Sequence, residues 1–334
     1  MSAQLRRAKL KSLAKINLDL RILNKREDGF HELRTVFQTI SLADTIEIEF
    51  EPSRRTELSI DGDQIPDNLI LRAAEAVLDT MKVRARVRFK LTKRIPMGGG
   101  LGGGSSNAAA VLIALPVLAG HEVLVEEIAA KLGSDVPFFL HGGTAVALGR
   151  GTEMYPLPDP DEEPILLVAP GVHVSTGPAY AALGRTLTFT GLSRSINGFQ
   201  AYVRAIGVAR RAGPASALSG NDFEAVVFRQ YPQLKTMAAK LSKAGAVGVR
   251  MSGSGSTLFG IFGTTAERDR AKVLLDGDRV FRESRVMPAK LVSERTYHKM
   301  WRSQLREHVV RNENHPRHND LWPLRSRYMN RNAR

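Results

Sequence analysis

The sequence contains no cysteine among its 334 residues. Without thiols the chain forms no disulfide bond, binds no zinc through cysteine and has no cysteine nucleophile. No apolar run approaches the roughly 18 residues of a transmembrane helix. The first stretch, MSAQLRRAKLKSLAKINL, has basic residues but no long apolar core and no small-residue cleavage site. We therefore expect no signal peptide, no membrane partner and a cytoplasmic protein.

Three catalytic or binding patterns are also absent. The eight histidines are scattered and form no HExxH or similar metal-binding spacing. The glycine–serine turns lack the strand-to-helix elbow of G-x-S-x-G hydrolases. No basic strand is interleaved with the aromatic residues that stack on RNA bases. The sequence therefore predicts no protein-built metal site and no serine hydrolase, and it argues against nucleic acid as the main partner.

The composition, 43% hydrophobic and 25% charged, is that of a globular protein long enough for about two domains. The net charge of +14 favours polyanionic partners, either nucleic acid or phosphorylated small molecules. Part of the excess lies in residues 306–334, where seven arginines face three acidic residues without hydrophobic periodicity. We expect a disordered basic tail there. The alternative is an arm that binds nucleic acid or a membrane surface.

Hydrophobic periodicity predicts a mixture of strands and helices. Strands are expected at 13–22, 45–50, 83–91, 144–148, 165–169, 246–251, 257–262 and 286–292. Helices are expected at 68–81 with Asp67 as its cap, after the glycine-rich segment near 105, at 124–132, near Pro137, from about 221, at 234–245 and at 265–276. The strands and helices do not alternate regularly, so the expected fold class is α+β.

The proline-rich, acidic segment YPLPDPDEEP at 155–164 is the best candidate for a domain boundary. It predicts an N-terminal domain over residues 1–160 and a C-terminal domain over 161–305, followed by the tail at 306–334.

The segment KRIPMGGGLGGGSSNAAAVLIAL (93–115) places six glycines between a strand and an alanine-rich helix. The first turn of a helix leaves backbone N–H groups unpaired, and glycines let a phosphate approach them closely. Ser105, Ser106 and Asn107 are good cap residues with side chains that can donate hydrogen bonds. Lys93 and Arg94 add positive charge. The segment therefore predicts a phosphate-binding loop.

Two familiar phosphate loops do not fit this segment. It lacks the Gly-Lys-Ser/Thr ending of the common NTPases. The G-x-G-x-x-G dinucleotide fingerprint needs a buried parallel strand before it, whereas VRARVRFKL alternates apolar residues with arginine. A second glycine–serine turn, SGSGS (252–256), is either a hairpin loop or a second wall of the same site.

Lys15 and Asp135 are the candidates for chemistry. Lys15 lies on the polar side of the alternating strand 13–22, with Asn17 and Asp19, and that side could simply face solvent. Asp135 precedes Pro137 in GSDVPFF and could simply cap a helix. Alternatively, Asp135 is a general base and a nearby lysine stabilises the developing alkoxide. The pattern alone leaves these alternatives open.

Taken together, the motifs resemble a known family. PMGGGLGGGSSNAA is similar to the nucleotide-binding signature of the GHMP kinases (galactose, homoserine, mevalonate and phosphomevalonate kinases and relatives), and SGSGST is similar to their second glycine motif. LAKINLDLRILNKREDGFHEL and GSDVPFF resemble the branch of the family that acts on a cytidine-linked sugar alcohol. The resemblance runs from about Leu13 to Leu305 and does not cover the tail.

The resemblance implies a fold and a set of roles. The expected N-terminal domain is like domain 2 of ribosomal protein S5, and the expected C-terminal domain is ferredoxin-like. Lys15 and Asp135 match the catalytic pair, with Asp135 as base. The matched ATP loop is Pro96, Met97, Gly98, Gly99, Gly100, Leu101, Gly102, Gly103, Gly104, Ser105 and Ser106. The matched substrate residues are Asn17, Phe30, His31, Thr176 and Tyr180. Phe30 stands where a tyrosine is frequent, which removes a hydroxyl but keeps an aromatic face.

The resemblance implies phosphorylation, by ATP with Mg²⁺, of the 2-hydroxyl of a cytidine diphosphate-linked methylerythritol. This reaction belongs to non-mevalonate isoprenoid synthesis. The expected partner is this small molecule, and the expected state is a monomer or weak homodimer. One alternative is a GHMP kinase for mevalonate or homoserine. The other is a basic RNA-binding protein.

Overall fold

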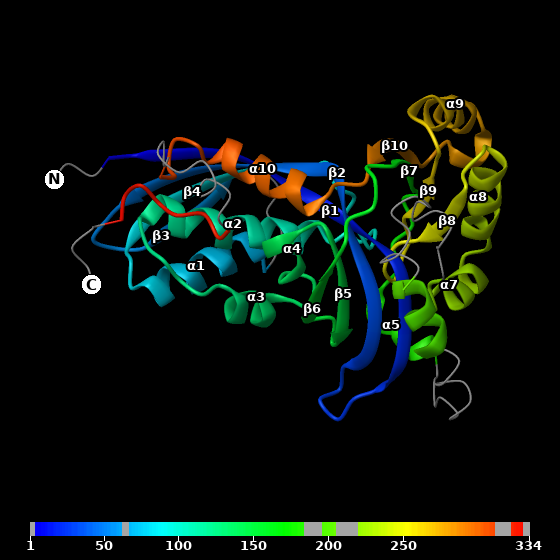
Figure 1. Ribbon diagram of the computed structural model, residues 1–334, viewed down its shortest axis with the longest axis horizontal. Coiled ribbons are helices and arrows are strands. Elements are labelled where there is room, and N and C mark those ends of the chain that lie inside the picture. The colour runs from blue at the N-terminus through cyan, green and yellow to red at the C-terminus, as the bar shows by residue number, and fades with distance from the viewer. Residues whose placement is uncertain (1–3, 62–66, 184–195, 205–219, 311–321, 330–334) are drawn as a thin grey trace.

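The computed structural model describes residues 4–61, 67–183, 196–204, 220–310 and 322–329, which form two sheets with their helices (Figure 1). The N-terminal sheet holds β1 (Arg6–Lys25), β2 (His31–Pro52), β3 (Glu57–Asp61), β4 (Ala85–Thr92), β5 (Thr144–Gly149) and β6 (Glu153–Leu157). The C-terminal sheet holds β7 (Pro164–Ala169), β8 (Gly248–Met251), β9 (Leu258–Ile261) and β10 (Arg285–Lys290). The helices with defined bounds are α1 (Leu69–Met81), α2 (Gly103–Ala119), α3 (Glu126–Leu132), α4 (Phe138–His141), α5 (Thr176–Leu183), α7 (Glu224–Gln230), α8 (Pro232–Lys243), α9 (Thr265–Asp276), the 3₁₀ turn η2 (Arg279–Phe281) and α10 (Glu294–Gln304).

The long strand β2 organises the N-terminal sheet. It pairs with β1 along almost its whole length, and on its other side it pairs with β4 at one end and β5 at the other. The described pairs are antiparallel except β3 with β4, which are parallel. β1 and β2 are 20 and 22 residues long and run as one ribbon from the N-terminal helices to the C-terminal domain (Figure 1).

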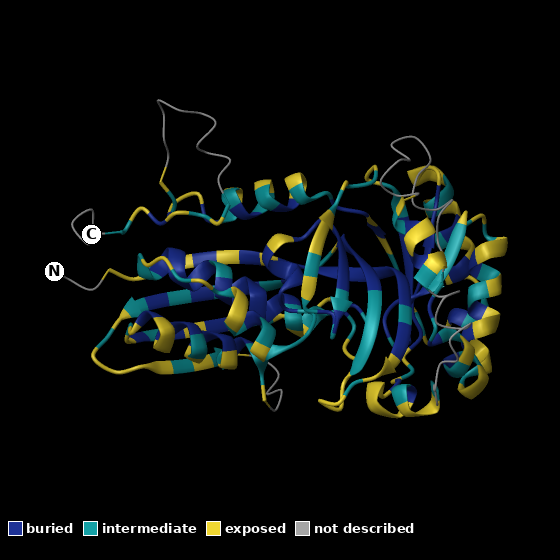
Figure 2. Cartoon of the chain, turned by 60° about the horizontal axis from the view of Figure 1, so that its bottom comes forward, coloured by how far each residue is buried: buried dark blue, intermediate teal, exposed yellow. Residues whose placement is uncertain are grey.

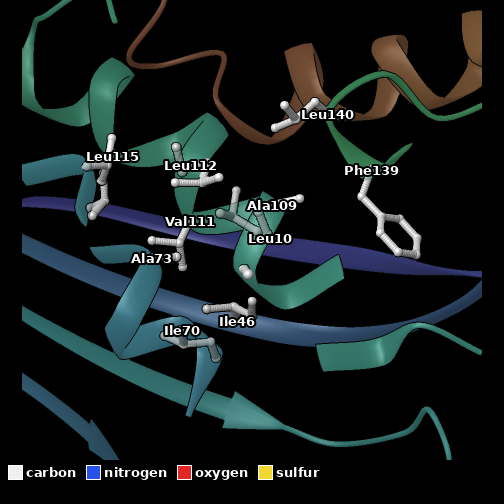
Figure 3. Close-up of a cluster of buried hydrophobic side chains, with 14 of the residues drawn as sticks. Leu10, Ile46, Ile70, Ala73, Ala109, Val111, Leu112, Leu115, Phe139 and Leu140 are labelled. Carbon is white, nitrogen blue, oxygen red and sulfur yellow. The ribbon is translucent and has the colours of Figure 1, made fainter. Parts of the chain in front are cut away.

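The core of the N-terminal domain is built around α2. This helix is apolar on every side, which is typical of a helix surrounded by protein. It is buried from Ser106 to Leu112 and again from Ala114 to Leu118. Figure 3 shows Val111 and Leu112 of α2 among side chains from β1, β2, α1 and α4, including Leu10, Ile46 and Ile70. The packing fixes the first turn of α2, and with it the end of the glycine loop.

The C-terminal sheet has the strand order β10-β7-β9-β8, and its described pairs are antiparallel. With α8 and α9 as its crossings, this is the ferredoxin-like arrangement. Leu166 and Val168 face a core shared with α8 and α9. Ile165 and Leu167 face a second core shared with β1, β2 and β5. The expected α+β class is confirmed, and the two domains pack through the sheet face opposite the helices.

Strand β1 is buried on both sides, so the half-buried strand expected at 13–22 is wrong. Ile16 and Leu18 lie in the core between the domains. Lys15, Asn17 and Asp19 on the other side are only 3%, 3% and 0% exposed. The alternation correctly predicts that the two sides of β1 differ. The polar side, however, faces the interior of a cleft and not solvent. Figure 2 shows these inner strands as buried, while the outward faces of the C-terminal helices are exposed.

Several local expectations are refined by the structure. The cap of α1 is Asn68, whose side chain accepts a hydrogen bond from the Ile70 N–H at 3.0 Å, and not Asp67. Asp67 instead has a positive φ of 54°. The acidic linker is shorter than expected because β6 occupies its first residues. The other expected strands and helices are present with shifted ends, whereas β3, β6, α5 and α10 were not expected. None of the described helices combines the length and the apolarity needed to cross a bilayer.

After the C-terminal sheet, the chain returns to the N-terminal domain. The Val292 N–H donates to the Thr39 carbonyl at 2.9 Å, and α10 follows along the N-terminal sheet (Figure 1). Tyr297 and Trp301 of α10 are each 1% exposed within the N-terminal core. The Tyr297 hydroxyl donates to the Phe139 carbonyl at 2.5 Å.

The tail also packs on the N-terminal domain where it is described. Tyr328 contacts His308 through a 3.0 Å hydrogen bond between its hydroxyl and Nδ1, and its ring lies 3.8 Å from the Arg6 guanidinium carbon. The Ser326 hydroxyl donates to the Val117 carbonyl at 2.6 Å. Residues 306–310 and 322–329 thus depart from the disordered tail expected. Their side chains contact aromatic rings and backbone carbonyls, and the hydrophobic periodicity of the sequence does not predict these contacts. Residues 311–321 and 330–334 lie outside the described part of the chain.

We predict that Tyr328→Ala lowers the free energy of unfolding by about 1–3 kcal/mol, because it removes a hydrogen bond and a cation–π contact. Arg325→Ala is the control, since its 3.7 Å ion pair with Glu122 is exposed and contributes about 0–1 kcal/mol. Urea unfolding of the full chain measures both. Equal stability of the Tyr328 variant and the wild type would show that the tail is detached in solution.

Candidate active site

A cleft of about 920 Å³ lies where the β1–β2 ribbon meets the two glycine turns and the segment leading into α5. It brings together residues from both domains. Those expected from the sequence that line it are Lys15, Asn17, Phe30, His31, Gly98, Gly100, Gly102, Asp135, Thr176 and Tyr180. The cleft is therefore the candidate active site.

Lys15 and Asp135 meet in this cleft. The Lys15 ammonium nitrogen is 3.3 Å from Asp135 Oδ2, and it donates a hydrogen bond to Asn17 Oδ1 at 2.8 Å. The Lys15 side chain is 4% exposed and that of Asp135 is 32% exposed, so the carboxylate can contact a ligand directly. Asp135 is not the cap of α4, because the cap position is Pro137 and carries no side-chain hydrogen bond. Both simpler alternatives, a solvated lysine and a helix cap, are thereby excluded.

A chain of hydrogen bonds fixes Asn17 beside this pair. The Asn17 amide donates to Thr35 Oγ1 at 2.7 Å, and the Thr35 hydroxyl donates to the Asp19 carbonyl at 2.6 Å. The register of β1 against β2 is irregular on both sides of these residues, between Leu13 and Lys15 and between Asn17 and Asp19. Such irregularities re-aim side chains near functional sites. Between these irregularities Lys15 and Asn17 are two residues apart and lie on one side of the strand, at hydrogen-bond distance.

The glycine loop begins after β4 and ends in the first turn of α2. Gly98, Gly100 and Gly102 have φ values of +65°, +75° and +68°, a region where residues with a Cβ are strained. The loop lies directly against β1, because the Lys15 N–H donates to the Leu101 carbonyl at 3.0 Å. Gly102 is the N-cap of α2 and offers no side chain to the helix N–H groups. The cap residue therefore provides no side-chain acceptor for those groups.

The remaining loop residues differ in their environment. Pro96 and Ser105 are half-buried, Met97 and Gly104 are exposed, and Gly99 and Leu101 are buried. Gly103 opens α2. Ser106 is 2% exposed, and its hydroxyl donates to the Leu13 carbonyl at 2.6 Å. Ser105, Ser106 and Asn107 were expected as helix caps, and this is wrong because they lie inside α2 and the cap is Gly102.

The second glycine turn, between β8 and β9, packs directly on the first. The Ser252 hydroxyl donates to the Gly100 carbonyl at 2.9 Å, and the Thr257 N–H donates to the Gly99 carbonyl at 3.3 Å. A Cβ added at Gly100 would lie 2.1 Å from the Ser252 carbonyl oxygen. The turn is thus both a hairpin loop and a wall of the cleft.

Aromatic side chains line the other end of the cleft. The rings of His31 and Tyr180 are stacked with their centres 4.4 Å apart, and Phe223 meets Tyr180 edge-on at 4.8 Å. Burial and the nearby charge of Asp135 raise the pKa of Tyr180 to about 12. Burial and the charge of Lys25 lower the pKa of His31, which leaves a neutral imidazole at pH 7.

Phe30 and Thr176 complete this end of the cleft. Phe30 is 49% exposed, and the Arg150 guanidinium carbon lies 3.9 Å from the centre of its ring. The Thr176 hydroxyl lies 3.0 Å from that of Ser254 in the second glycine turn.

Sequence reasoning missed Thr35, Phe223 and Arg150, which all line the cleft. Thr35 and Phe223 are ordinary residues of a strand and a helix entry. Arg150 stands between two glycines in a tight turn, which the pattern alone does not distinguish from any surface arginine. None of the three carries a signal of its own in one sequence.

Comparison with known proteins gives a consistent class. Residues 68–143 match the GHMP kinases N terminal domain, and residues 202–276 match the GHMP kinases C terminal domain. Solved structures share the fold at low identity, among them homoserine kinase from Cytophaga hutchinsonii (16% identity, TM-score 0.66, covering 86% of this chain and 97% of that one). The fold is thus that of the GHMP kinases.

More similar relatives narrow the family. The chain is 49% identical to 4-diphosphocytidyl-2-C-methyl-D-erythritol kinase from Solibacter usitatus, over 97% of this chain and 98% of the relative. It is 40% identical to the enzyme of that name from Pelotomaculum thermopropionicum, over 78% and 89%. A crystal structure of 4-(cytidine 5'-diphospho)-2C-methyl-D-erythritol kinase aligns with TM-score 0.69 and 35% identity over 85% of this chain and 98% of that one. The chain belongs to the 4-diphosphocytidyl-2-C-methyl-D-erythritol kinase family of GHMP kinases, and it is a small-molecule kinase.

We predict that Gly100→Ala lowers the free energy of unfolding by at least about 2 kcal/mol, because a Cβ would collide with the Ser252 carbonyl group at an already left-handed residue. Gly104→Ala is the matched control. Its Cβ would find Leu69 at 3.6 Å and nothing closer. Inside a helix this change stabilises by about 0.5–1 kcal/mol. Urea unfolding compares the two variants, and equal effects would contradict the close contact between the two turns.

Proposed function

We propose that the protein transfers the γ-phosphate of ATP to the 2-hydroxyl of 4-diphosphocytidyl-2-C-methyl-D-erythritol, giving the 2-phosphate and ADP in non-mevalonate isoprenoid precursor synthesis. The observation that carries the proposal is the Lys15–Asp135 pair, held 3.3 Å apart in a cleft with a glycine loop at one end and aromatic rings at the other. The names and identities of the relatives support the choice of substrate.

Asp135 is the proposed base and Lys15 the proposed electrostatic partner. The Asp135 carboxylate accepts the proton of the substrate hydroxyl as its oxygen forms a bond to the γ-phosphorus. The bond from the γ-phosphorus to the bridging oxygen breaks, and ADP leaves with that electron pair. The Lys15 ammonium lies beside the carboxylate and stabilises the negative charge that develops on the attacking oxygen. Asn17 holds the ammonium in place through its 2.8 Å hydrogen bond.

The glycine loop, Pro96 to Ser106, is the proposed site for the ATP phosphates. The uncapped start of α2 and the absence of side chains at Gly98, Gly100 and Gly102 support this role. Among the described residues, no three His, Asp or Glu side chains are grouped to hold a metal ion. The donor set therefore fits Mg²⁺ carried mainly by the ATP phosphates, which it would help to neutralise. Of the two serine hydroxyls in the loop, that of Ser106 already donates to the backbone of β1, whereas that of Ser105 does not.

Phe30, His31, Thr176 and Tyr180 are the proposed substrate-side residues. An aromatic face stacks well on a flat cytosine, and a neutral imidazole can hydrogen-bond its edge. One face of Tyr180 is covered by His31, and one face of Phe30 by Arg150. The base would therefore use the other face of a ring or displace the group that covers it.

Three further expectations stay predictions. They are the domain boundary near residue 160, a monomeric or weakly dimeric state, and a cytoplasmic location.

ATP consumption by the purified protein with Mg²⁺ tests the function. The panel contains the diphosphocytidyl substrate, mevalonate, homoserine and galactose. Turnover on the first alone is expected. Turnover on another member would keep the kinase and overturn the proposed substrate residues. ATP binding without any turnover, together with steeply salt-dependent RNA binding, would favour the nucleic-acid alternative.

We predict that Asp135→Asn lowers kcat by at least about 10²-fold while the affinity for ATP stays within a few-fold, because a general base contributes 10²–10⁴-fold and the loop is untouched. Asp161→Asn makes the same chemical change on an exposed residue outside the cleft and should leave kcat unchanged. Steady-state kinetics and calorimetric ATP titration measure the two effects. A parallel loss of ATP binding and turnover would contradict the base assignment.

A further inference from the structure

Asp44 is a fully buried carboxylate on β2 that lies outside the cleft lining. Both of its oxygens are used. Oδ1 accepts hydrogen bonds from the Arg94 N–H at 2.7 Å and the Ile95 N–H at 2.8 Å. Oδ2 accepts from Lys93 Nζ at 2.5 Å and from Asn107 Nδ2 at 3.1 Å. A buried carboxylate is stable only when paired in this way, so its partners are tightly fixed.

The partners of Asp44 flank the glycine loop on both sides. Residues 93–95 come directly before Pro96, and Asn107 comes directly after Ser106. Asn107 is itself anchored, since its Oδ1 accepts a 2.5 Å hydrogen bond from the Ser12 hydroxyl. One carboxylate therefore ties the entry of the loop to its exit and both to the central sheet. Glycines between these points have unusual conformational freedom, so the fixed ends limit the conformations that the loop can adopt.

Asp44 also fixes a positive charge beside the end of the glycine loop. A Cβ added at Gly103, the first residue of α2, would lie 3.2 Å from Lys93 Nζ. The ammonium thus sits beside a helix N-terminus, where the helix dipole repels a cation. The carboxylate of Asp44 offsets this repulsion and holds the lysine there. A phosphate at the loop would meet an ammonium already in position.

We propose that Asp44 is a positioning residue for ATP phosphate binding. It acts through the backbone at 94–95, through Asn107 and through the Lys93 ammonium, and it does not touch the nucleotide. The proposal rests on the proposed role of the glycine loop as the phosphate site. It does not depend on the identity of the acceptor substrate.

Calorimetric titration of the full chain with ATP and with adenosine tests the proposal. In Asp44→Asn, two amide protons would face Lys93 and Asn107, so the loop ends should separate. The affinity for ATP should fall by at least about tenfold, the scale of one lost hydrogen bond to a charged group. The affinity for adenosine, which has no phosphates, should stay unchanged. Asp161→Asn serves again as the exposed control.

A double variant that exchanges the residues at positions 44 and 107 conserves the charge. It separates a positioning role of Asp44 from a general effect on the stability of the protein. Asp44→Asn combined with Asn107→Asp restores a donor–acceptor pair between positions 44 and 107 and keeps one carboxylate in the cluster, so most of the ATP affinity should return. If Asp44→Asn does not fold, Asn107→Ala removes the exit link alone and should still reduce ATP affinity more than adenosine affinity. Equal losses for both ligands, or an unchanged ATP affinity in a folded variant, would overturn the proposal. These titrations need no turnover, so failure of the acceptor assignment would leave them interpretable.

Discussion

The backbone at Gly100 approaches the Ser252 carbonyl group so closely that no side chain fits between them. This contact joins a loop of the N-terminal domain to a turn of the C-terminal domain at the end of the cleft where phosphates are proposed to bind. Because the loop has few side chains of its own, its shape must be imposed by its surroundings. β1 holds it through the Leu101 carbonyl, the C-terminal turn holds it through Ser252, and α2 holds its end. The position of the loop therefore depends on the whole interface between the domains.

Strand β1 connects this interface to the proposed catalytic pair. Its apolar side, with Ile16 and Leu18, fills the core between the two sheets. Its polar side presents Lys15 and Asn17 to the cleft. Any relative shift of the domains would move both sides together, since they belong to one backbone. The same strand thus transmits the packing of the domains to the position of the ammonium beside Asp135.

Local pattern and resemblance anticipated different parts of this structure. Alternation located β1, and the glycine segment located the loop that leads into α2, because both are properties of neighbouring residues. Burial of Lys15 could not be read from alternation, since the groups that surround it, the glycine loop at Leu101 and the Asp135 carboxylate, come much later in the sequence. The pairing of Lys15 with Asp135 likewise came only from the family resemblance, and the structure supplies its geometry.

Other features were missed for equally physical reasons. Helix α10 has few apolar residues among many charges, so its buried Tyr297 and Trp301 did not stand out. Asn68 rather than Asp67 caps α1 because Asp67 adopts a left-handed conformation one residue earlier. Asp44 looks like any acidic residue at the start of an alternating strand. Its hydrogen bonds to residues 93–95 and 107 are seen only in the structure, because these segments are distant from it in the sequence.

The return of α10 to the N-terminal sheet has a consequence for how the chain is made. Tyr297 and Trp301 complete the core around α2, although most of that core is encoded before residue 150. During synthesis on the ribosome, the first domain therefore emerges with part of its apolar surface uncovered until nearly three hundred residues have been added. The ferredoxin-like domain is encoded as an insertion between two parts of its neighbour. The N-terminal core is thus completed by α10 only after the C-terminal sheet has been synthesised.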